Sequence, residues 1–313
     1  MRILIVIIII TTSLSCSSVS QNNETKNNSD TIIKKATTPI LKKFRSFEID
    51  TIPDINKNAK ERSSTFIKQR LEKLIGRSYK KRCEDINVSY PPSYVLFRTF
   101  KLEKEYEIWI ANKRSDTLKL LATLPICALD NKPGTKLMQG DGKTPEGFYT
   151  CKILYGSSNS FMWIKLNNSE IDNYGTVQYG SSFKLCLEYP LQIDKNRTRK
   201  FATGKKPGSA ICVHGNCVTA GCISFENKNF LPIFLSAKFH NTQKYGYPKV
   251  QIFPFRFSER LKEKWSKEVY SYMKPEDIIN FWEEIEPAYS LFEKHHKAIK
   301  VSFLNNKYKF TEY

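Results

Sequence analysis

Histidine is scarce in this chain of 313 residues, which contains only four. His214 is the only one before position 240, so imidazole chemistry in that part of the chain depends on this residue alone. The adjacent pair His295–His296 falls late in a charged segment with helical spacing. We expect that pair to lie on a solvent-exposed face.

Long apolar runs are also missing. The longest unbroken run, Ile3–Ile10, is too short to span a bilayer as a permanent helix. With Met1–Arg2 before it and small residues after it, the run is typical of an export signal. Ser13–Cys16 is similar to a lipobox, although its leucine stands two places before the cysteine instead of three. We expect a leader over residues 1–16 and a lipid anchor on Cys16, with plain secretion or a retained signal anchor as alternatives.

Apolar residues are sparse in the segment that follows. Residues 17–40 are rich in Ser, Asn, Lys and Thr and cannot bury much apolar surface. We expect residues 17–57 to form a flexible tether. After it, the patterns predict an N-terminal helical segment over 58–94, a β-rich core over 95–255 and a C-terminal helical extension over 256–313.

Acidic residues are outnumbered, with 31 Asp and Glu against 50 Lys and Arg and a formal net charge of +19. A basic balance can indicate nucleic-acid binding, but the sequence has no zinc-finger spacing, helix-turn-helix or aromatic RNA-binding signature. We therefore expect no nucleic-acid partner. An anionic wall polymer or a membrane surface fits the charge as well, and so does a solvated surface covered by lysines.

The middle of the chain is a succession of short β-branched and aromatic runs. They predict strands over 95–100, 106–111, 117–126, 147–154, 161–166, 184–189, 209–214 and 249–253. Helical spacing predicts helices over 58–80 (ended by Gly76), 227–239, 258–273 and 275–297, the last one bent or interrupted at Pro287. A closing hairpin is predicted over 299–310. The expected fold class is α+β, with a mostly β core and flanking helices.

The segment Ile211–Ser224 carries the strongest chemical signal, because it places His214 and Cys222 eight residues apart at the end of an apolar run. A free thiol, with a pKa of about 8.5, is mostly protonated at neutral pH, and a nearby imidazole can accept its proton. Gly215 and Gly221 allow the chain to double back, so that Cys222 returns to the imidazole with backbone amides aimed at a developing oxyanion. The segment therefore predicts a cysteine nucleophile and its base.

The other cysteines give a weaker signal. If Cys16 is lipidated, seven remain, and an odd number leaves at least one free thiol. Four are expected to be small core hydrophobes: Cys127, Cys151, Cys186 and Cys212. Cys217 is expected to be a packing thiol of the active loop, with a regulatory disulfide to Cys222 as the alternative.

Zinc is a second interpretation of the same segment. Cys212, His214, Cys217 and Cys222 are the soft ligands that zinc prefers. Cys212 and His214 share one face of a strand, but a short loop would have to return both later thiols to it. We therefore expect no metal.

The stretch His214-Gly-Asn-Cys-Val-Thr-Ala-Gly-Cys222 resembles the His-Gly-x-Cys-x-x-x-Gly-Cys core of the YafK-like murein branch of the L,D-transpeptidase (YkuD-type) family. The same resemblance extends to Val95–Lys101, Tyr106–Trp109, Gly140–Tyr149, Tyr189–Pro190 and Phe281–Glu293. It covers roughly residues 60–313.

The resemblance implies a YkuD-like β-sandwich and a cysteine L,D-transpeptidase of cell wall biogenesis, in the periplasm or cell envelope. Cys222 would attack an L-to-D amide of a peptidoglycan stem peptide, such as the meso-diaminopimelate to D-alanine bond. His214 would move the proton, and amides near Gly221 and Cys222, in the loop that Gly215 begins, would hold the oxyanion. No cofactor is implied. The implied partners are stem peptides, a wall-attached lipoprotein and the anchoring membrane.

The chain also departs from commoner members of the family. Ala220 and Ser224 stand where those members have a second His and an Arg, which removes the usual contact for a substrate carboxylate. By resemblance, Thr144, Pro145 and Gly147 would border the substrate groove, although alone they predict a plain β-turn. Ser224 is either a groove residue or a helix cap. The functional alternatives are a hydrolase of peptidoglycan peptide or peptidoglycan–lipoprotein links and a non-catalytic wall-binding lipoprotein.

Overall fold

The computed structural model describes residues 47–48, 64–156, 164–166, 181–269 and 272–313. The predicted leader, the anchor position Cys16, most of the tether and the start of the N-terminal helical segment lie outside the described residues. Among the helices that are described, none combines the length and the apolar character needed to cross a membrane.

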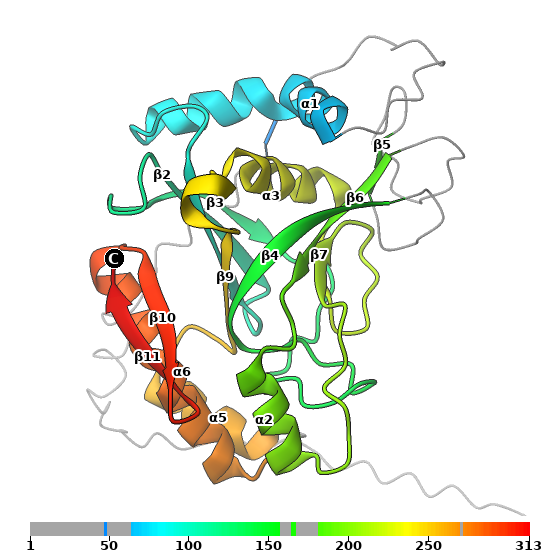
Figure 1. The fold of residues 1–313 in the computed structure, drawn as a ribbon, viewed down its shortest axis with the longest axis vertical. Coiled ribbons are helices and arrows are strands. Elements are labelled where there is room, and N and C mark those ends of the chain that lie inside the picture. The colour runs from blue at the N-terminus through cyan, green and yellow to red at the C-terminus, as the bar shows by residue number, and fades with distance from the viewer. Residues whose placement is uncertain (1–46, 49–63, 157–163, 167–180, 270–271) are drawn as a thin grey trace, which may run out of the picture. The chain divides into compact units, whose positions relative to one another are not determined.

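A curled, mixed sheet of nine strands forms the centre of the fold (Figure 1). Its strands follow the order β3-β2-β1-β9-β4-β6-β7-β8, and β5 pairs with β6. Their bounds are β1 (Tyr94–Phe100), β2 (Glu105–Ala111), β3 (Lys119–Pro125), β4 (Gly147–Gly156), β5 (Ile164–Leu166), β6 (Ser181–Leu187), β7 (Cys212–His214), β8 (Ile223–Ser224) and β9 (Lys249–Phe253). The pairs β1–β9 and β7–β8 are parallel. Each predicted run contains a strand, and the predicted α+β class with a β-rich core is confirmed.

Both faces of the sheet are covered, as the central strand β1 shows by being buried along its whole length. Because side chains alternate along a strand, Val95 and Phe97 enter one apolar cluster, whereas Leu96 and Phe100 enter the other. The alternation therefore divides the core into two layers, one on each side of the sheet.

Helices α1 (Ser64–Asp85) and α3 (Asn227–Phe239) cover the first face and lie against each other (Figure 1). The hydroxyls of Tyr79 on α1 and Ser236 on α3 are hydrogen-bonded at 2.7 Å. Helix α3 is apolar on nearly all sides, which is the pattern of a helix enclosed by other elements. It begins five residues after Cys222, so its packing holds the end of the predicted active loop in place.

The second face carries α2 (Gln192–Phe201), α5 (Glu259–Glu268), α6 (Pro275–His295) and the hairpin of β10 (Ile299–Leu304) and β11 (Lys307–Glu312). The short helix α4 (Thr242–Tyr245) precedes β9. Trp282 and Phe292 of α6 are fully buried against the sheet. The predicted C-terminal helices and hairpin are thus present and pack directly on the core.

A buried carboxylate joins this face to the segment that carries Thr144. The side chain of Glu146 accepts hydrogen bonds from Lys101 Nζ at 3.1 Å, from the Gly134 amide at 2.7 Å and from Trp282 Nε1 at 3.0 Å. Lys101 Nζ also donates to the carbonyl of Thr144 at 3.1 Å. A fully paired buried charge holds its neighbours in one arrangement, because breaking a single partner would leave the charge uncompensated.

Two predicted helix breaks, an end at Gly76 and an interruption at Pro287, are absent from the helices that the structure describes. Gly76 does not end α1, because the fully buried stripe that includes Ile75 continues beyond the glycine through Tyr79 and Cys83. The burial of these side chains outweighs the roughly 1 kcal/mol that glycine costs in a helix. Helix α6 continues through Pro287, with buried residues on both sides of the proline. The sequence patterns also missed α2, α4 and β8.

Candidate active site

The two predicted catalytic residues lie on neighbouring strands. His214 ends β7, and Cys222 immediately precedes β8. The parallel register pairs Val213 with Ile223, so Cys222 stands beside Cys212 and on the same face of the sheet as His214. Both residues are buried, with 5% of Cys222 and none of His214 exposed.

The connection between these strands is unusually short. Parallel strands normally need a crossover of about a dozen residues or more, whereas seven residues separate His214 from Cys222. The loop closes through left-handed backbone at Asn216 (φ 81°), Cys217 (φ 46°) and Gly221 (φ 112°). The predicted doubling back of the chain is therefore present.

Gly221 also meets a second segment of the chain. A Cβ atom on Gly221 would lie 2.8 Å from the carbonyl oxygen of Lys143, which is closer than side chains are found to pack. The segment 140–149, predicted to lie beside the substrate, thus contacts the residue that precedes the nucleophile. Only glycine fits between them.

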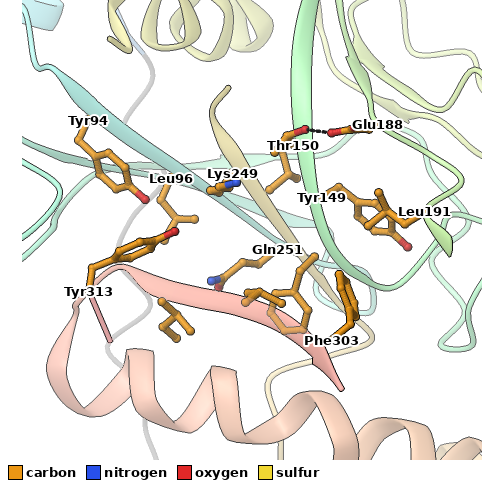
Figure 2. Close-up of a pocket in the computed structure, with 14 residues that line it drawn as sticks. Tyr94, Leu96, Tyr149, Thr150, Glu188, Leu191, Lys249, Gln251, Phe303 and Tyr313 are labelled. Carbon is orange, nitrogen blue, oxygen red and sulfur yellow. Dashed lines mark hydrogen bonds between the residues drawn. The ribbon is translucent and has the colours of Figure 1, made fainter. Parts of the chain in front are cut away.

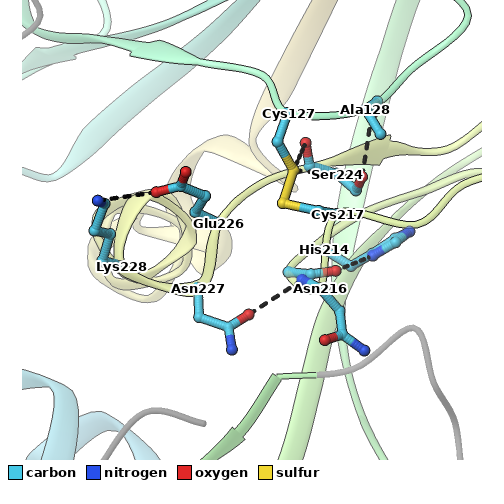
Figure 3. Close-up of a disulfide and its surroundings, with 10 residues drawn as sticks. Cys127, Ala128, His214, Asn216, Cys217, Ser224, Glu226, Asn227 and Lys228 are labelled. Atoms are coloured by element: carbon cyan, nitrogen blue, oxygen red, sulfur yellow. Dashed lines mark hydrogen bonds and ion pairs between the residues drawn. A yellow bond between two sulfur atoms is a disulfide. The ribbon is translucent and has the colours of Figure 1, made fainter. Parts of the chain in front are cut away.

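A disulfide between Cys127 and Cys217 pins the outer part of the loop (Figure 3). The prediction of a core thiol at Cys127 is wrong, and so are both alternatives for Cys217, because each residue is the other's partner. Sequence spacing could not show this pairing, since the two cysteines are 90 residues apart.

Backbone and amide contacts fix the base of the loop. Ser224 and Ala128 exchange backbone hydrogen bonds of 2.8 and 3.2 Å, and the Ser224 hydroxyl donates to the Ala128 carbonyl at 3.1 Å. The side-chain oxygen of Asn227, in the first turn of α3, accepts from the Asn216 amide at 3.1 Å (Figure 3). The loop is therefore held at its start, middle and end.

A second disulfide links Cys186 of β6 to Cys212 of β7, which are direct partners in the antiparallel register. Both had been predicted as core thiols, and those predictions are wrong. Cys151 is buried and free as predicted, and Cys83 and Cys222 are also free. The Cys186–Cys212 bridge ties together the two strands that lead to the nucleophile.

The Cys222 sulfur has polar neighbours in a buried setting. It accepts a hydrogen bond from the Cys212 amide at 3.3 Å and contacts the Ala210 carbonyl oxygen at 3.6 Å. Burial raises the pKa of the Cys222 thiol, although the Cys212 amide and the nearby ammonium groups of Lys184 and Lys136 oppose that rise. The thiol is therefore protonated at neutral pH.

His214 is prepared to accept a proton. Its Nδ1 lies 2.6 Å from the Gly215 carbonyl oxygen, which can only accept, so Nδ1 donates and Nε2 is the basic nitrogen. Nε2 is buried and has no hydrogen-bond partner among the described residues. Burial lowers the pKa of His214, with a further lowering from Lys184 and an opposing effect of Gly215. The imidazole is therefore neutral at neutral pH.

No hydrogen bond joins Cys222 and His214 within the described part of the chain. The strand register nevertheless puts both side chains on one face of the sheet. Both groups, the thiol and the imidazole, are neutral there. Catalytic contacts are often long in the absence of substrate and shorten in the complex. The arrangement supplies a nucleophile, a base with a free nitrogen and nearby positive charge.

The remaining predicted site residues are mostly buried. Thr144, Pro145 and Gly147 are buried, whereas Gly140 and Gly142, just before them, are exposed. Ser224 is fully buried by its bonds to Ala128 and does not cap α3. Their part in a substrate groove remains a prediction, whereas Gly215 has a defined contact with the imidazole.

Three neighbours of the nucleophile were not predicted. Lys184 and Lys136 belong to segments far from Cys222 in the sequence. The third neighbour is the backbone amide of Cys212, which donates to the Cys222 sulfur. Alternation along β6 puts Lys184 and Cys186 on one face, but the sequence does not reveal that β6 lies next to β7. Only the strand order shows it.

The zinc interpretation is contradicted by the disulfides. Cys212 and Cys217 are joined to different partners and offer no thiolate to a metal. In the described ranges, His, Cys, Asp and Glu side chains form no group of three that could hold a metal ion.

Known proteins share both sequence and structural features with this chain. No protein-family model matches it. A protein of Escherichia coli strain K12 named "Putative L,D-transpeptidase YafK" is 28% identical over 220 residues, which cover 69% of this chain and 73% of that protein. The protein of the same name from Escherichia coli O157:H7 matches to the same extent.

Two solved structures are also similar. The helical cell shape determining protein Pgp2 from Campylobacter jejuni has 18% identity and a TM-score of 0.33, over 74% of this chain and 85% of that chain. Bdellovibrio bacteriovorus Bd1075 has 16% identity and a TM-score of 0.32, over 67% and 75%. Scores this low do not bear on fold or activity.

Proposed function

Because this chain is related to the YafK-like L,D-transpeptidases, we propose that it is a cysteine enzyme that cleaves L-to-D amides of peptidoglycan stem peptides through an acyl-enzyme on Cys222. The observation that carries the proposal is the position of Cys222 and His214 on one face of β7 and β8, held by a loop that is fixed at three points.

The reaction would begin with proton transfer. Nε2 of His214 takes the thiol proton, and the Cys212 amide and the ammonium groups of Lys184 and Lys136 stabilise the thiolate that forms. The thiolate attacks the scissile carbonyl, and the backbone amides of Gly221 and Cys222 are the donors nearest to the developing oxyanion. The imidazolium then protonates the leaving amine.

The acyl-enzyme can be resolved in two ways. An incoming amine gives transpeptidation, and water gives hydrolysis of a peptide or of a link between peptidoglycan and a lipoprotein. The short loop favours hydrolysis as the second candidate, because excluding water requires covering segments. Val218, near the loop's tip, is 63% exposed and is held by its neighbour's disulfide, so it does not fold over the thiol.

The proposed location is the cell envelope, with the chain exported and anchored through Cys16. Two disulfides support export, since such bonds form and persist outside the reducing cytosol. The basic charge suits an anionic wall polymer. A non-catalytic wall-binding role fits less well, because it gives no purpose to a fixed thiol beside a basic nitrogen.

The direct test is incubation of the purified chain with peptidoglycan sacculi, followed by mass spectrometry of the released muropeptides. We expect loss of the terminal D-alanine in the presence of the enzyme, with crosslinked or shortened products showing which acceptor is used. The Cys222→Ala protein is the control. Identical muropeptides with the two proteins would contradict the proposal.

The acceptor is tested separately with an acyl donor and increasing D-amino acid. Exchange that exceeds tripeptide formation at every acceptor concentration would reject the hydrolase candidate. Tripeptide formation that persists at high acceptor would support it.

A further inference from the structure

A pocket lies between the second face of the sheet and the C-terminal hairpin, away from the predicted nucleophile (Figure 2). Strands β1, β4 and β9 form its floor, and β10 with the last residue of the chain forms its cover. Its volume is about 150 Å³. This is the size class of a small molecule, and nothing in the proposed reaction uses it.

The walls of the pocket are largely apolar and aromatic. The rings of Phe148, Phe303 and Tyr313 and the aliphatic side chains of Leu96 and Val301 line it. Phe303 and Tyr313 are 50% and 43% exposed, so these two large rings still have apolar surface that a ligand could cover. Such walls favour a ligand with an apolar body, and a few polar groups would fix its orientation.

Lys249 supplies a cation at the floor of this pocket. Its side chain is partly buried, and its ammonium group has no hydrogen bond or ion pair with any described residue. The carboxylate of Glu188, the residue after β6, also lines the pocket and attracts the Lys249 ammonium group from beyond ion-pair distance, but it already accepts a hydrogen bond from the Thr150 hydroxyl at 2.7 Å. A partly buried positive charge without a directly bonded partner is costly, so Lys249 marks a position for an anion.

Gln251 supplies a second donor beside it. The residue is only 3% exposed, and its side-chain oxygen accepts from Arg98 Nε at 3.2 Å. Arg98 is in turn paired with Glu107 at 3.1 Å and Glu293 at 2.7 Å. This buried network fixes the amide, whose NH₂ group has no acceptor among the described residues and extends into the pocket (Figure 2).

We propose that this pocket binds a small monocarboxylate with an apolar body, whose carboxylate accepts hydrogen bonds from the Lys249 ammonium and the Gln251 amide. The aromatic rim then covers the apolar part. Lys249 and Gln251 are two residues apart on β9 and both line the pocket, so each can donate to one oxygen of a carboxylate, and pairing with an ionised group makes such bonds stronger than neutral ones. The proposal does not depend on the reaction at Cys222.

The pocket and the nucleophile share one face of the sheet. Lys249 of β9 pairs with Thr150 of β4, whose carbonyl accepts from the amide of Glu188, the residue that follows β6. Cys186 of β6 pairs with Cys212 of β7, which lies beside Cys222. Four strand spacings of about 4.8 Å each put the pocket roughly 19 Å from Cys222. The carboxylate that binds in the pocket can belong to a free acid, or to the carboxyl end of a short peptide that lies along the sheet.

The experiment measures binding directly by ligand-observed NMR on the purified chain, with no catalytic readout. The probes are benzoate and 4-methylpentanoate as free acids, N-acetyl-D-alanyl-D-alanine as a peptide end, and benzamide as the uncharged match of benzoate. We expect at least one carboxylate to bind, and benzoate to bind more tightly than benzamide if free acids are the source.

Two variants separate recognition from folding. Lys249→Met should weaken binding of the carboxylate by about tenfold, because the charged partner is lost while the apolar stem remains. Lys152→Met, on the exposed part of neighbouring β4, should change nothing. Three results would overturn the proposal. The first is that no carboxylate binds, and the second is that benzoate and benzamide bind equally while the peptide does not bind. The third is that binding is unchanged in Lys249→Met.

Discussion

The backbone amide of Cys212 donates a hydrogen bond to the sulfur of Cys222 across the β7–β8 pair, at 3.3 Å. This bond favours the thiolate, whereas burial raises the thiol pKa. Activation of the thiol therefore depends on His214, whose Nε2 is unprotonated and unpaired in the described structure. In the proposed reaction, Cys222 and His214 would therefore act as one unit.

That dependence gives the first prediction. Cys222→Ala should abolish turnover, and His214→Ala should lower kcat/KM by about 10²–10⁴-fold, the usual effect of removing a general base. Circular dichroism should show an intact fold in both proteins. A thiol reagent should label Cys222 fastest of the free cysteines, and more slowly once His214 is removed. Full activity of either variant on sacculi would contradict the assigned roles.

The charge of Lys184 should set the pH range of the reaction. Its ammonium group lowers the pKa of both His214 and Cys222. In Lys184→Met the imidazolium is less disfavoured and the thiolate less favoured, so both pKa values should rise. The acid limb of the activity profile, which reports protonation of His214, should then move to higher pH.

This shift can be measured as the pH dependence of kcat/KM and of alkylation by iodoacetamide. Lys195→Met, an exposed change on α2, serves as the control and should leave the profile unchanged. Opposite movement of the two limbs would contradict a shared electrostatic cause.

Gly221→Ala tests the contact with the Lys143 carbonyl. The added Cβ would meet that oxygen at 2.8 Å and would also occupy a left-handed backbone position. We expect a loss of about 1–3 kcal/mol in stability and a large loss of activity, because the loop must move and carries Cys222 with it.

Gly142→Ala is the matched control for that change. Its φ of +68° imposes a similar backbone cost, but no atom lies within 4 Å of the added carbon. We expect Gly142→Ala to retain activity and to lower the melting temperature less than Gly221→Ala does, because its only cost is a non-glycine residue at positive φ. Equal loss of activity in both variants would show that the contact with Lys143 is unimportant.

Removal of the Cys127–Cys217 bridge, by changing both residues to Ala, should lower the free energy of unfolding by about 2–4 kcal/mol. The bridge closes a long segment of chain and restrains the loop between His214 and Cys222. Activity should fall as well, since the loop gains freedom. Urea unfolding and kcat/KM measure the two effects, and a double variant as stable and active as the natural protein would show that the bridge is dispensable.

The lipid anchor is tested by Cys16→Ser, which should release the mature protein from membranes without changing its activity on soluble muropeptides. Intact mass of the membrane-bound protein should show an acyl group. Its absence would replace anchoring by plain secretion.

The placement of His214 and Cys222 on one face of the sheet could be predicted from the sequence because it depends on local spacing. His214 and Cys222 are eight residues apart, and two glycines between them allow the chain to return. Most strands could be predicted for the same reason, since short β-branched and aromatic runs bounded by turn residues are a local pattern.

Other features depend on contacts that no local pattern records. The bridges join Cys127 to Cys217 and Cys186 to Cys212, and cysteine counting does not give connectivity. Strand β8 has only two residues and is defined by its pairing with β7. Helix α2 is highly polar, so its apolar side chains give little periodic signal.

The parallel pairing of β1 with β9 has a consequence for how the chain becomes active. Strand β1 (residues 94–100) cannot complete its pairing until β9 (residues 249–253) has been made. The active-site strands β7 and β8 lie between them in the sequence. Such distant pairings form slowly, because the intervening chain must be closed into a loop first. A partly synthesised chain that ends before residue 249 therefore has Cys222 but not the completed sheet around it, and the proposed reaction at this thiol must await the arrival of β9.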